Sequence, residues 1–80
     1  MLFDLYFTPD STNIIKVEYH KKSKTLAVTF VKAGETALYQ YYNVPLEVFN
    51  EFAKAESAGK FMHKNIRGKY EFEMLLNRGE

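Results

Sequence analysis

Three consecutive runs of alternating apolar and polar residues constrain the fold of this chain more than any other feature. The runs cover residues 13–19, 25–31 and 37–42. An alternation with a period of two places successive side chains on opposite faces of a β-strand. The connecting residues 20–24 and 32–35 are few enough to form hairpin turns. The three runs therefore predict an antiparallel meander.

The same alternation predicts which side chains face the core. In the first run, Ile15, Val17 and Tyr19 share one face, and Ile14 lies on the other. One face of each strand should be buried against the rest of the protein. In the second run, the apolar residues expected on that buried face are Leu26, Val28 and Phe30.

The N-terminal residues 1–7 alternate in the same way and predict a further strand, which residues 8–11 end. A hydrophobic strand at the edge of a sheet can pair with another chain through its free N–H and C=O groups. Residues 1–7 are therefore a candidate contact with a protein partner or with a second copy of this chain. The alternative is that they only add a strand to their own sheet.

Helix signals begin at Pro45, which suits the first turn of a helix because its missing N–H would have no partner there. Ser57 can cap a second, shorter helix that runs to about Arg67, where Gly68 ends it. Residues 70–74 alternate again and predict a short closing strand. In the first helix, apolar residues recur at helical spacing, at Leu46, Phe49, Phe52 and Ala53.

These elements predict an α+β fold. It consists of an antiparallel β-meander of three to four strands, followed by two short helices packed on one face and a short closing strand. Because 80 residues leave room for one core, we expect a single domain over residues 1–80. Hydrophobic residues make up 46% of the chain, which is enough apolar bulk for a folded protein.

The chain contains no cysteine. This excludes disulfide bonds and thiolate zinc sites, and it fits a reducing compartment, so we expect the cytoplasm. No stretch approaches the ~20 apolar residues that a membrane-spanning helix needs, and the opening residues lack the pattern of a secretory signal. We therefore expect no membrane partner.

The most basic stretch lies near the C-terminus. At about 100° per residue, a helix places Lys60, Lys64 and Arg67 on one side, with His63 beside them, and Lys69 follows. We call these five residues the basic stripe. Phosphate groups bind to such clusters in a salt-dependent manner. The alternative is an ordinary solvated helix face.

Arg67 differs in kind from the lysines. Its guanidinium group can bind a phosphate or a carboxylate through two parallel hydrogen bonds. It can equally brace the fold by bonding carbonyl groups at the helix end, or Glu71 or Glu73. The sequence leaves both roles open.

Tyr39 and Tyr41 share one face of the third run, whereas Gln40 and Tyr42 share the other. Exposed aromatic rings on a sheet can stack against unpaired bases. The alternative is that one or both tyrosines pack beneath a helix, with the hydroxyl group at the rim of the core.

No sequence motif indicates catalysis or a resident metal ion. His20 and His63 are the only histidines, and neither has a second ligand at the spacing of a zinc site. No Gly-rich phosphate loop and no serine nucleophile motif occurs. We therefore expect a protein that is not an enzyme and carries no cofactor and no metal.

Four ordered segments resemble the KTSC family, a small domain named after the C-terminal extension of some lysyl-tRNA synthetases. The family also occurs as free-standing bacterial and phage proteins. The segments are STNIIKVEY, TLAVTF, LYQYYNVP and SAGKFMHKNIRGKY, and the resemblance covers residues 11–72. The positions that match family motifs are Tyr39 and Tyr41, then Val44 and Pro45, then Phe61, Asn65, Ile66, Arg67 and Tyr70.

Three features depart from the family pattern. Glu18 stands where a glycine is common, the hairpin around Gly34 is longer than the usual Asn-Gly type, and Phe72 replaces a second late tyrosine. Residues 1–10 lie outside the resemblance. The resemblance implies RNA binding, because of the synthetase context, and it implies no catalytic activity.

The basic stripe and the resemblance together predict a non-catalytic binding module for RNA, a nucleotide or another phosphate-bearing ligand. The alternatives are a protein interaction module or small homodimer that uses residues 1–7, and a small-nucleotide pocket between the sheet and the second helix. The candidate binding residues are Tyr39, Tyr41, Lys60, His63, Lys64, Arg67 and Lys69.

Overall fold

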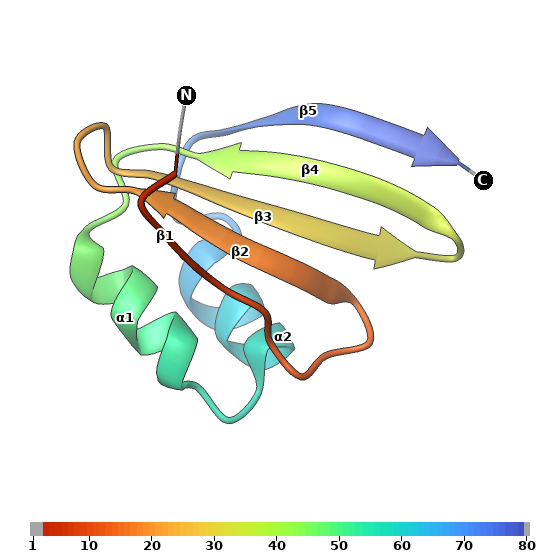
Figure 1. Cartoon of the computed structure of the whole chain (residues 1–80), viewed down its shortest axis with the longest axis horizontal. Helices are drawn as coiled ribbons and strands as arrows, with labels where there is room; N and C mark the ends of the chain where they lie inside the picture. The colour runs from red at the N-terminus through yellow and green to blue at the C-terminus, as the bar shows by residue number, and fades with distance from the viewer. Residues whose placement is uncertain (1–2, 80) are drawn as a thin grey trace.

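Five antiparallel strands form one sheet in the computed structural model, which describes the backbone of residues 3–79 and the side chains of residues 3–75 (Figure 1). The strands lie side by side in chain order, and every neighbouring pair is antiparallel. The predicted α+β fold with an antiparallel meander is therefore confirmed. The strands are β1 (Leu5–Phe7), β2 (Ile14–His20), β3 (Thr25–Lys32), β4 (Glu35–Tyr41) and β5 (Phe72–Gly79).

Two short helical segments connect β4 to β5. The first is α1 (Leu46–Lys54), and Pro45 occupies its N-cap position with extended backbone. The second begins as α2 (Ala58–Phe61) and continues as a π-helical turn, η1 (Met62–Ile66). Both segments lie on the same side of the sheet, beneath the β1–β2 half in Figure 1. None of the helices among residues 3–79 is long and apolar enough to cross a membrane.

The core lies between the sheet and these helices. Phe52 of α1 is 1% exposed, and its ring stacks on Phe61 at a centroid distance of 5.0 Å. Phe7 of β1 meets the rings of Phe49 and Phe52 edge-on at 5.5 and 5.3 Å. Burial of such large apolar side chains is the main term that favours folding. The other buried residues of this cluster are Ile14, Val17, Tyr19, Leu26, Val28, Tyr41, Val44, Ala58, Met62 and Ile66.

Strand β2 contradicts the simple alternation at its start. Ile14 is 2% exposed, whereas Ile15, expected on the buried face, is 48% exposed. The register shifts between Ile14 and Lys16, which pair with Phe30 and Thr29. A β-bulge of this kind places an extra residue opposite one partner, so the faces exchange at that point. The predicted orientation of Ile15 is therefore wrong, and Ile14 takes its place in the core.

The hairpin between β3 and β4 is shorter than expected. Lys32 pairs directly with Glu35, so Ala33 and Gly34 are the two loop residues. Their φ angles are 54° and 80°. Two consecutive positive φ angles are typical of the type I′ turn, which suits the twist of a two-residue hairpin. The hairpin is thus of the usual short type, with alanine where asparagine is common.

The closing strand is longer than the predicted residues 70–74. It extends to Gly79 and pairs with β4 along its length, from Tyr41 opposite Phe72 to Glu35 opposite Gly79. Strand β5 pairs with β4 on the side away from β3, and a register shift between Leu38 and Tyr39 interrupts this pairing. Strand β5 consequently forms one edge of the sheet.

Candidate functional site

The basic stripe lies on the segment that leads from α2 into β5. Met62 and Ile66 are 2% and 0% exposed and hold this segment against the sheet. Ser57 accepts a hydrogen bond of 3.2 Å from the backbone N–H of Lys60 and so caps α2, as its position predicts. All five members of the basic stripe are exposed, namely Lys60, His63, Lys64, Arg67 and Lys69.

Arg67 stands where η1 ends. Its backbone N–H donates to the carbonyl oxygen of Met62 at 2.9 Å, and Gly68 follows with a φ of 76°. Its side chain is exposed and takes part in none of the ion pairs or side-chain hydrogen bonds among residues 3–75. The bracing contacts to helix-end carbonyls, Glu71 or Glu73 therefore have no counterpart in this part of the chain. The guanidinium group is available to a ligand.

Tyr39 and Tyr41 lie together on the helix-facing side of β4, but they do not present two open rings. Tyr41 is 4% exposed and belongs to the core. Tyr39 is half-buried, and its ring is nearly parallel to that of Tyr41, at an angle of 17° and a centroid distance of 6.3 Å. Tyr39 is thus the more accessible member of the pair, and Tyr41 is an internal support.

The pKa of the Tyr41 hydroxyl group reflects this buried environment. Burial raises the pKa of Tyr41 to about 12, because the tyrosinate form loses its hydration, and the neighbouring Tyr39 adds to the effect. The positive charge of Arg67 acts in the opposite direction on the same pKa. Arg67 and the tyrosine pair therefore belong to one local environment.

Phe72 is the aromatic residue that the sequence interpretation left out of the site. It lies opposite Tyr41 on β5 and is 55% exposed. Its ring centroid is 5.6 Å from those of both Tyr39 and Tyr41. Met74 lies opposite Tyr39 on the same strand and is 50% exposed. The alternation in residues 70–74 identified this side of β5, but it did not show that the helices leave it uncovered.

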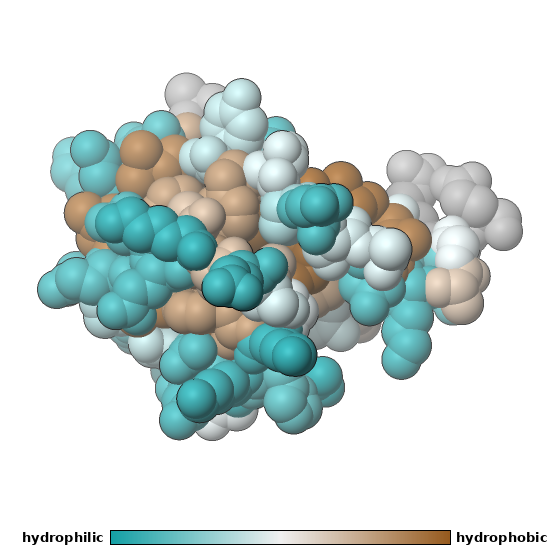
Figure 2. All heavy atoms as spheres, turned by 90° about the horizontal axis from the view of Figure 1, so that it is seen from below, coloured by the Kyte–Doolittle hydropathy of each residue, from teal (hydrophilic) through white to brown (hydrophobic). Residues whose placement is uncertain are grey.

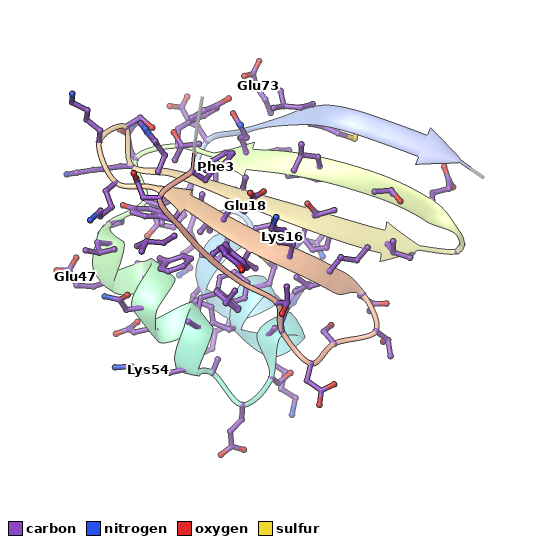
Figure 3. All side chains as sticks on the ribbon, viewed as in Figure 1. Phe3, Lys16, Glu18, Glu47, Lys54 and Glu73 are labelled. Carbon is purple, nitrogen blue, oxygen red and sulfur yellow. The ribbon has the colours of Figure 1, made fainter. Side chains whose placement is uncertain are left out.

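Acidic side chains lie on the other face of the sheet. Figure 3 shows Glu18 beside Lys16 on β2, and Glu73 on β5. Glu18 is 3.6 Å from the ammonium group of Lys16, and Glu73 accepts a hydrogen bond of 2.5 Å from Tyr42. This bond raises the pKa of Tyr42, because it favours the protonated hydroxyl group. The face that bears Tyr39 and Phe72 is separated from these carboxylates by the sheet.

A shallow, open hollow lies along residues 68–72, between the end of the basic stripe and Phe72. A second hollow lies between residues 7–10 and the helices, where Phe52 and Ala58 contribute to its wall. Among residues 3–79, no three histidine or acidic side chains are close enough to hold a metal ion. His20 is the last residue of β2, with Nδ1 2.7 Å from the hydroxyl of Ser23 in the following turn.

The N-terminal strand lies at the other edge of the sheet. Leu5, Tyr6 and Phe7 pair with β2, while Met1 and Leu2 lie outside the described residues. Leu5 and Phe7 pack against the core, and Tyr6 is 67% exposed. Strand β1 thus pairs with β2 along one edge. No strand among residues 3–79 lies along its other edge.

Comparison with known proteins agrees with this fold. The family model of the KTSC domain matches residues 10–70. The lysine-tRNA ligases of Trichormus variabilis and Nostoc punctiforme are 34% and 33% identical to the chain over 67 residues. The match covers 84% of this chain but only 11% of each ligase, so the chain spans a small part of the length of these curated relatives.

A solved structure is similar over nearly the whole chain. The crystal structure of a KTSC domain protein from Yersinia pestis has a TM-score of 0.80 and is 26% identical. The similarity covers 90% of this chain and 97% of that one. The five-stranded sheet with its helices is therefore shared with a separate protein of similar extent.

Proposed function

The chain belongs to the KTSC domain family, and we propose that it is a non-catalytic binding module for RNA or another phosphate-bearing ligand. One observation supports this proposal above the others. The guanidinium group of Arg67 is exposed, has no partner among residues 3–75, and lies in the environment of the tyrosine pair. An exposed arginine without a partner in this part of the chain can bind a phosphate group, and Tyr39, the more accessible ring of the pair, offers a surface for the attached base.

The rest of the basic stripe gives this contact its electrostatic support. Lys60, Lys64 and Lys69 are exposed, as is His63. Each cation near a phosphate chain adds a salt-sensitive contribution to binding, because bound counterions are released. The net charge of the whole chain is only +1. Binding would therefore depend on this local cluster and not on bulk charge.

The relatives support the RNA alternative among phosphate-bearing ligands. The matched segments belong to proteins named lysine-tRNA ligase. In our proposal the domain contributes to RNA contacts and not to the ligase reaction, because the match covers only 11% of each ligase. The proposal places the module in the cytoplasm, since a chain without cysteine fits a reducing compartment.

Fluorescence anisotropy with labelled single-stranded RNA at low salt tests the proposal. We expect micromolar or tighter binding, and Arg67→Ala should weaken it about tenfold or more, because a charge-assisted contact is lost. The RNA affinity of Arg67→Lys should lie between those of the unmodified chain and of Arg67→Ala, since lysine keeps the charge but not the paired hydrogen bonds.

Lys54→Ala is the matched control, because Lys54 is an exposed cation in the last turn of α1 and is not part of the basic stripe (Figure 3). It should bind within about twofold of the unmodified chain, as surface substitutions away from a site usually have small effects. Absence of RNA binding at low salt, or equal losses for Arg67→Ala and Lys54→Ala, would count against the proposal.

The second candidate is a protein interaction module or small homodimer that uses β1. It is favoured by the edge of β1, which has no neighbouring strand in the described part of the chain, and by the exposure of Tyr6. Light scattering at high protein concentration tests the homodimer. Association that is lost when residues 1–7 are deleted, in a chain whose fold is checked by circular dichroism, would support it, and a strictly monomeric intact chain would contradict it.

A further inference from the structure

The helix layer does not cover the whole sheet. Figure 1 shows the helices beneath β1 and β2, while β4 and β5 extend away from them. Figure 2, seen from below, shows polar and hydrophobic side chains mixed on the left, and a further hydrophobic area to the right of centre. On β5, Phe72 and Met74 are 55% and 50% exposed although they lie opposite Tyr41 and Tyr39. An uncovered aromatic and aliphatic surface of this kind marks a binding site more often than a scattered exposed residue does.

The ring of Phe72 is held in place from one side. It lies 5.6 Å from the rings of both Tyr39 and Tyr41, with a tilt of 34° to each. Tyr39 is in turn held by Phe30, which meets it edge-on at 5.6 Å. Tyr39, Tyr41 and Phe72 thus form a cluster of rings, and its inner member, Tyr41, is fixed by burial in the core. Phe72 is the outer, solvent-facing member of the cluster and needs little reorganisation to accept a flat ligand.

The charges near Phe72 indicate the chemistry of that ligand. The open hollow along residues 68–72 connects Phe72 with Lys69 and with the segment that bears Arg67. The carboxylate of Glu73 lies on the other face of the sheet, bonded to Tyr42. Glu71 also lines this hollow, so a ligand on the Phe72 side meets an aromatic ring, the cation of Lys69 and one carboxylate, with Arg67 one residue beyond the hollow. This combination fits a planar ring that carries a phosphate group.

We propose that this surface binds single-stranded RNA, with an unpaired base stacked on Phe72 and an adjacent phosphate on Arg67. The inference rests on the proposed function and adds to it the strandedness of the ligand and a stacking residue. A base in a duplex is covered on both faces by its neighbours, so only an unpaired base can stack on a protein ring. The site should therefore prefer single strands to duplexes.

Fluorescence anisotropy with a labelled single strand and with a duplex of the same length tests the inference. The intact chain should bind the single strand about tenfold more tightly than the duplex. Phe72→Leu keeps an apolar side chain but removes the ring, so single-strand affinity should fall about tenfold, while duplex affinity stays the same. Phe72→Tyr keeps the ring and should bind within about twofold of the unmodified chain.

Tyr6→Leu is the matched control, since it removes an exposed ring from the other face of the sheet and should leave RNA affinity unchanged. Thermal unfolding verifies that each variant is folded. Unchanged single-strand affinity in Phe72→Leu, or equal affinity for duplex and single strand, would overturn the inference while the proposed function stands. Failure of both RNAs to bind at low salt would overturn both. A change of oligomeric state in Phe72→Leu without a change in RNA affinity would assign the surface to a second copy of the chain.

Discussion

The hydroxyl group of Tyr19 donates a hydrogen bond of 2.5 Å to the carbonyl oxygen of Val44, 25 positions further along the chain. Tyr19 is 1% exposed and Val44 is 0% exposed. The ring of Tyr19 also stacks on Phe49 of α1 at 5.4 Å. This bond joins β2 to the residue that precedes the N-cap of α1, so it fixes the helix layer relative to the sheet.

Tyr19→Phe should lower the free energy of unfolding by about 1–3 kcal/mol, because it leaves the buried carbonyl of Val44 without a partner. Urea unfolding measures this loss. Tyr42→Phe is the control, since the bond from Tyr42 to Glu73 is exposed and its removal should cost less than about 0.5 kcal/mol. Equal losses in the two variants would contradict the structural role of the Tyr19 bond.

Stability should fall in alkaline solution because of the buried tyrosines. Burial raises the pKa of Tyr41 to about 12, and it also raises the pKa of Tyr19. The folded state then holds these protons more tightly than the unfolded state, whose tyrosine pKa is about 10. The stabilisation is complete below about pH 10 and is lost as the pH rises toward and through about 12.

Urea unfolding at a series of alkaline pH values, together with tyrosinate absorbance, tests this prediction. Tyr41→Phe should reduce the alkaline loss of stability and should remove a late phase from the absorbance titration. A single titration of all six tyrosines near their ordinary pKa would contradict the burial of Tyr41.

The hairpin between β3 and β4 offers a stabilising substitution. Ala33 has a φ of 54°, which is unfavourable for alanine but tolerated by asparagine. Ala33→Asn should therefore raise the free energy of unfolding by up to about 1 kcal/mol, which corresponds to a rise in Tm of roughly 4–8 °C for a domain of this size. Ala33→Val should lower the Tm, because a β-branched residue fits this backbone poorly. A higher Tm for the valine variant would contradict the turn geometry.

Two glycines should respond to alanine with opposite signs. Gly59 lies within α2, and a Cβ atom there would meet no atom within 4 Å. Gly59→Ala should stabilise the protein by about 0.5–1 kcal/mol, since glycine is the more flexible residue in the unfolded chain. Gly68 also has open space, but its φ is 76°, so Gly68→Ala should cost about 1–2 kcal/mol. Thermal unfolding of both variants checks the difference in sign, and a shift of the same sign in both would contradict it.

The order of elements could be predicted from the alternation and the helical spacing because both patterns reflect the burial of one face. At Ile15 the alternation predicts the wrong face of the strand. Whether an extra residue bulges out of β2 depends on how β2 pairs with β3, and that pairing is not encoded in the pattern of β2 alone. The core therefore contains Ile14, whereas a strict period of two had selected Ile15.

The exposure of Lys60, Lys64 and Arg67 could also be predicted, because helical spacing separates them from the buried Met62 and Ile66. The aromatic part of the site could not. Tyr39, Tyr41 and Phe72 share one face of the sheet, but their exposure depends on how far the helices reach across it. Neither the burial of Tyr41 nor the openness of Phe72 follows from the periodicity of their strands.

The most direct test of the proposed function is the salt dependence of RNA affinity in the unmodified chain and in Arg67→Ala. On a plot of log affinity against log salt concentration, the intact chain should show a negative slope. Arg67→Ala should bind more weakly at low salt and have a slope shallower by about 0.7, the value expected for one phosphate contact in a single strand. Coincident lines for the two proteins would contradict a phosphate contact at Arg67.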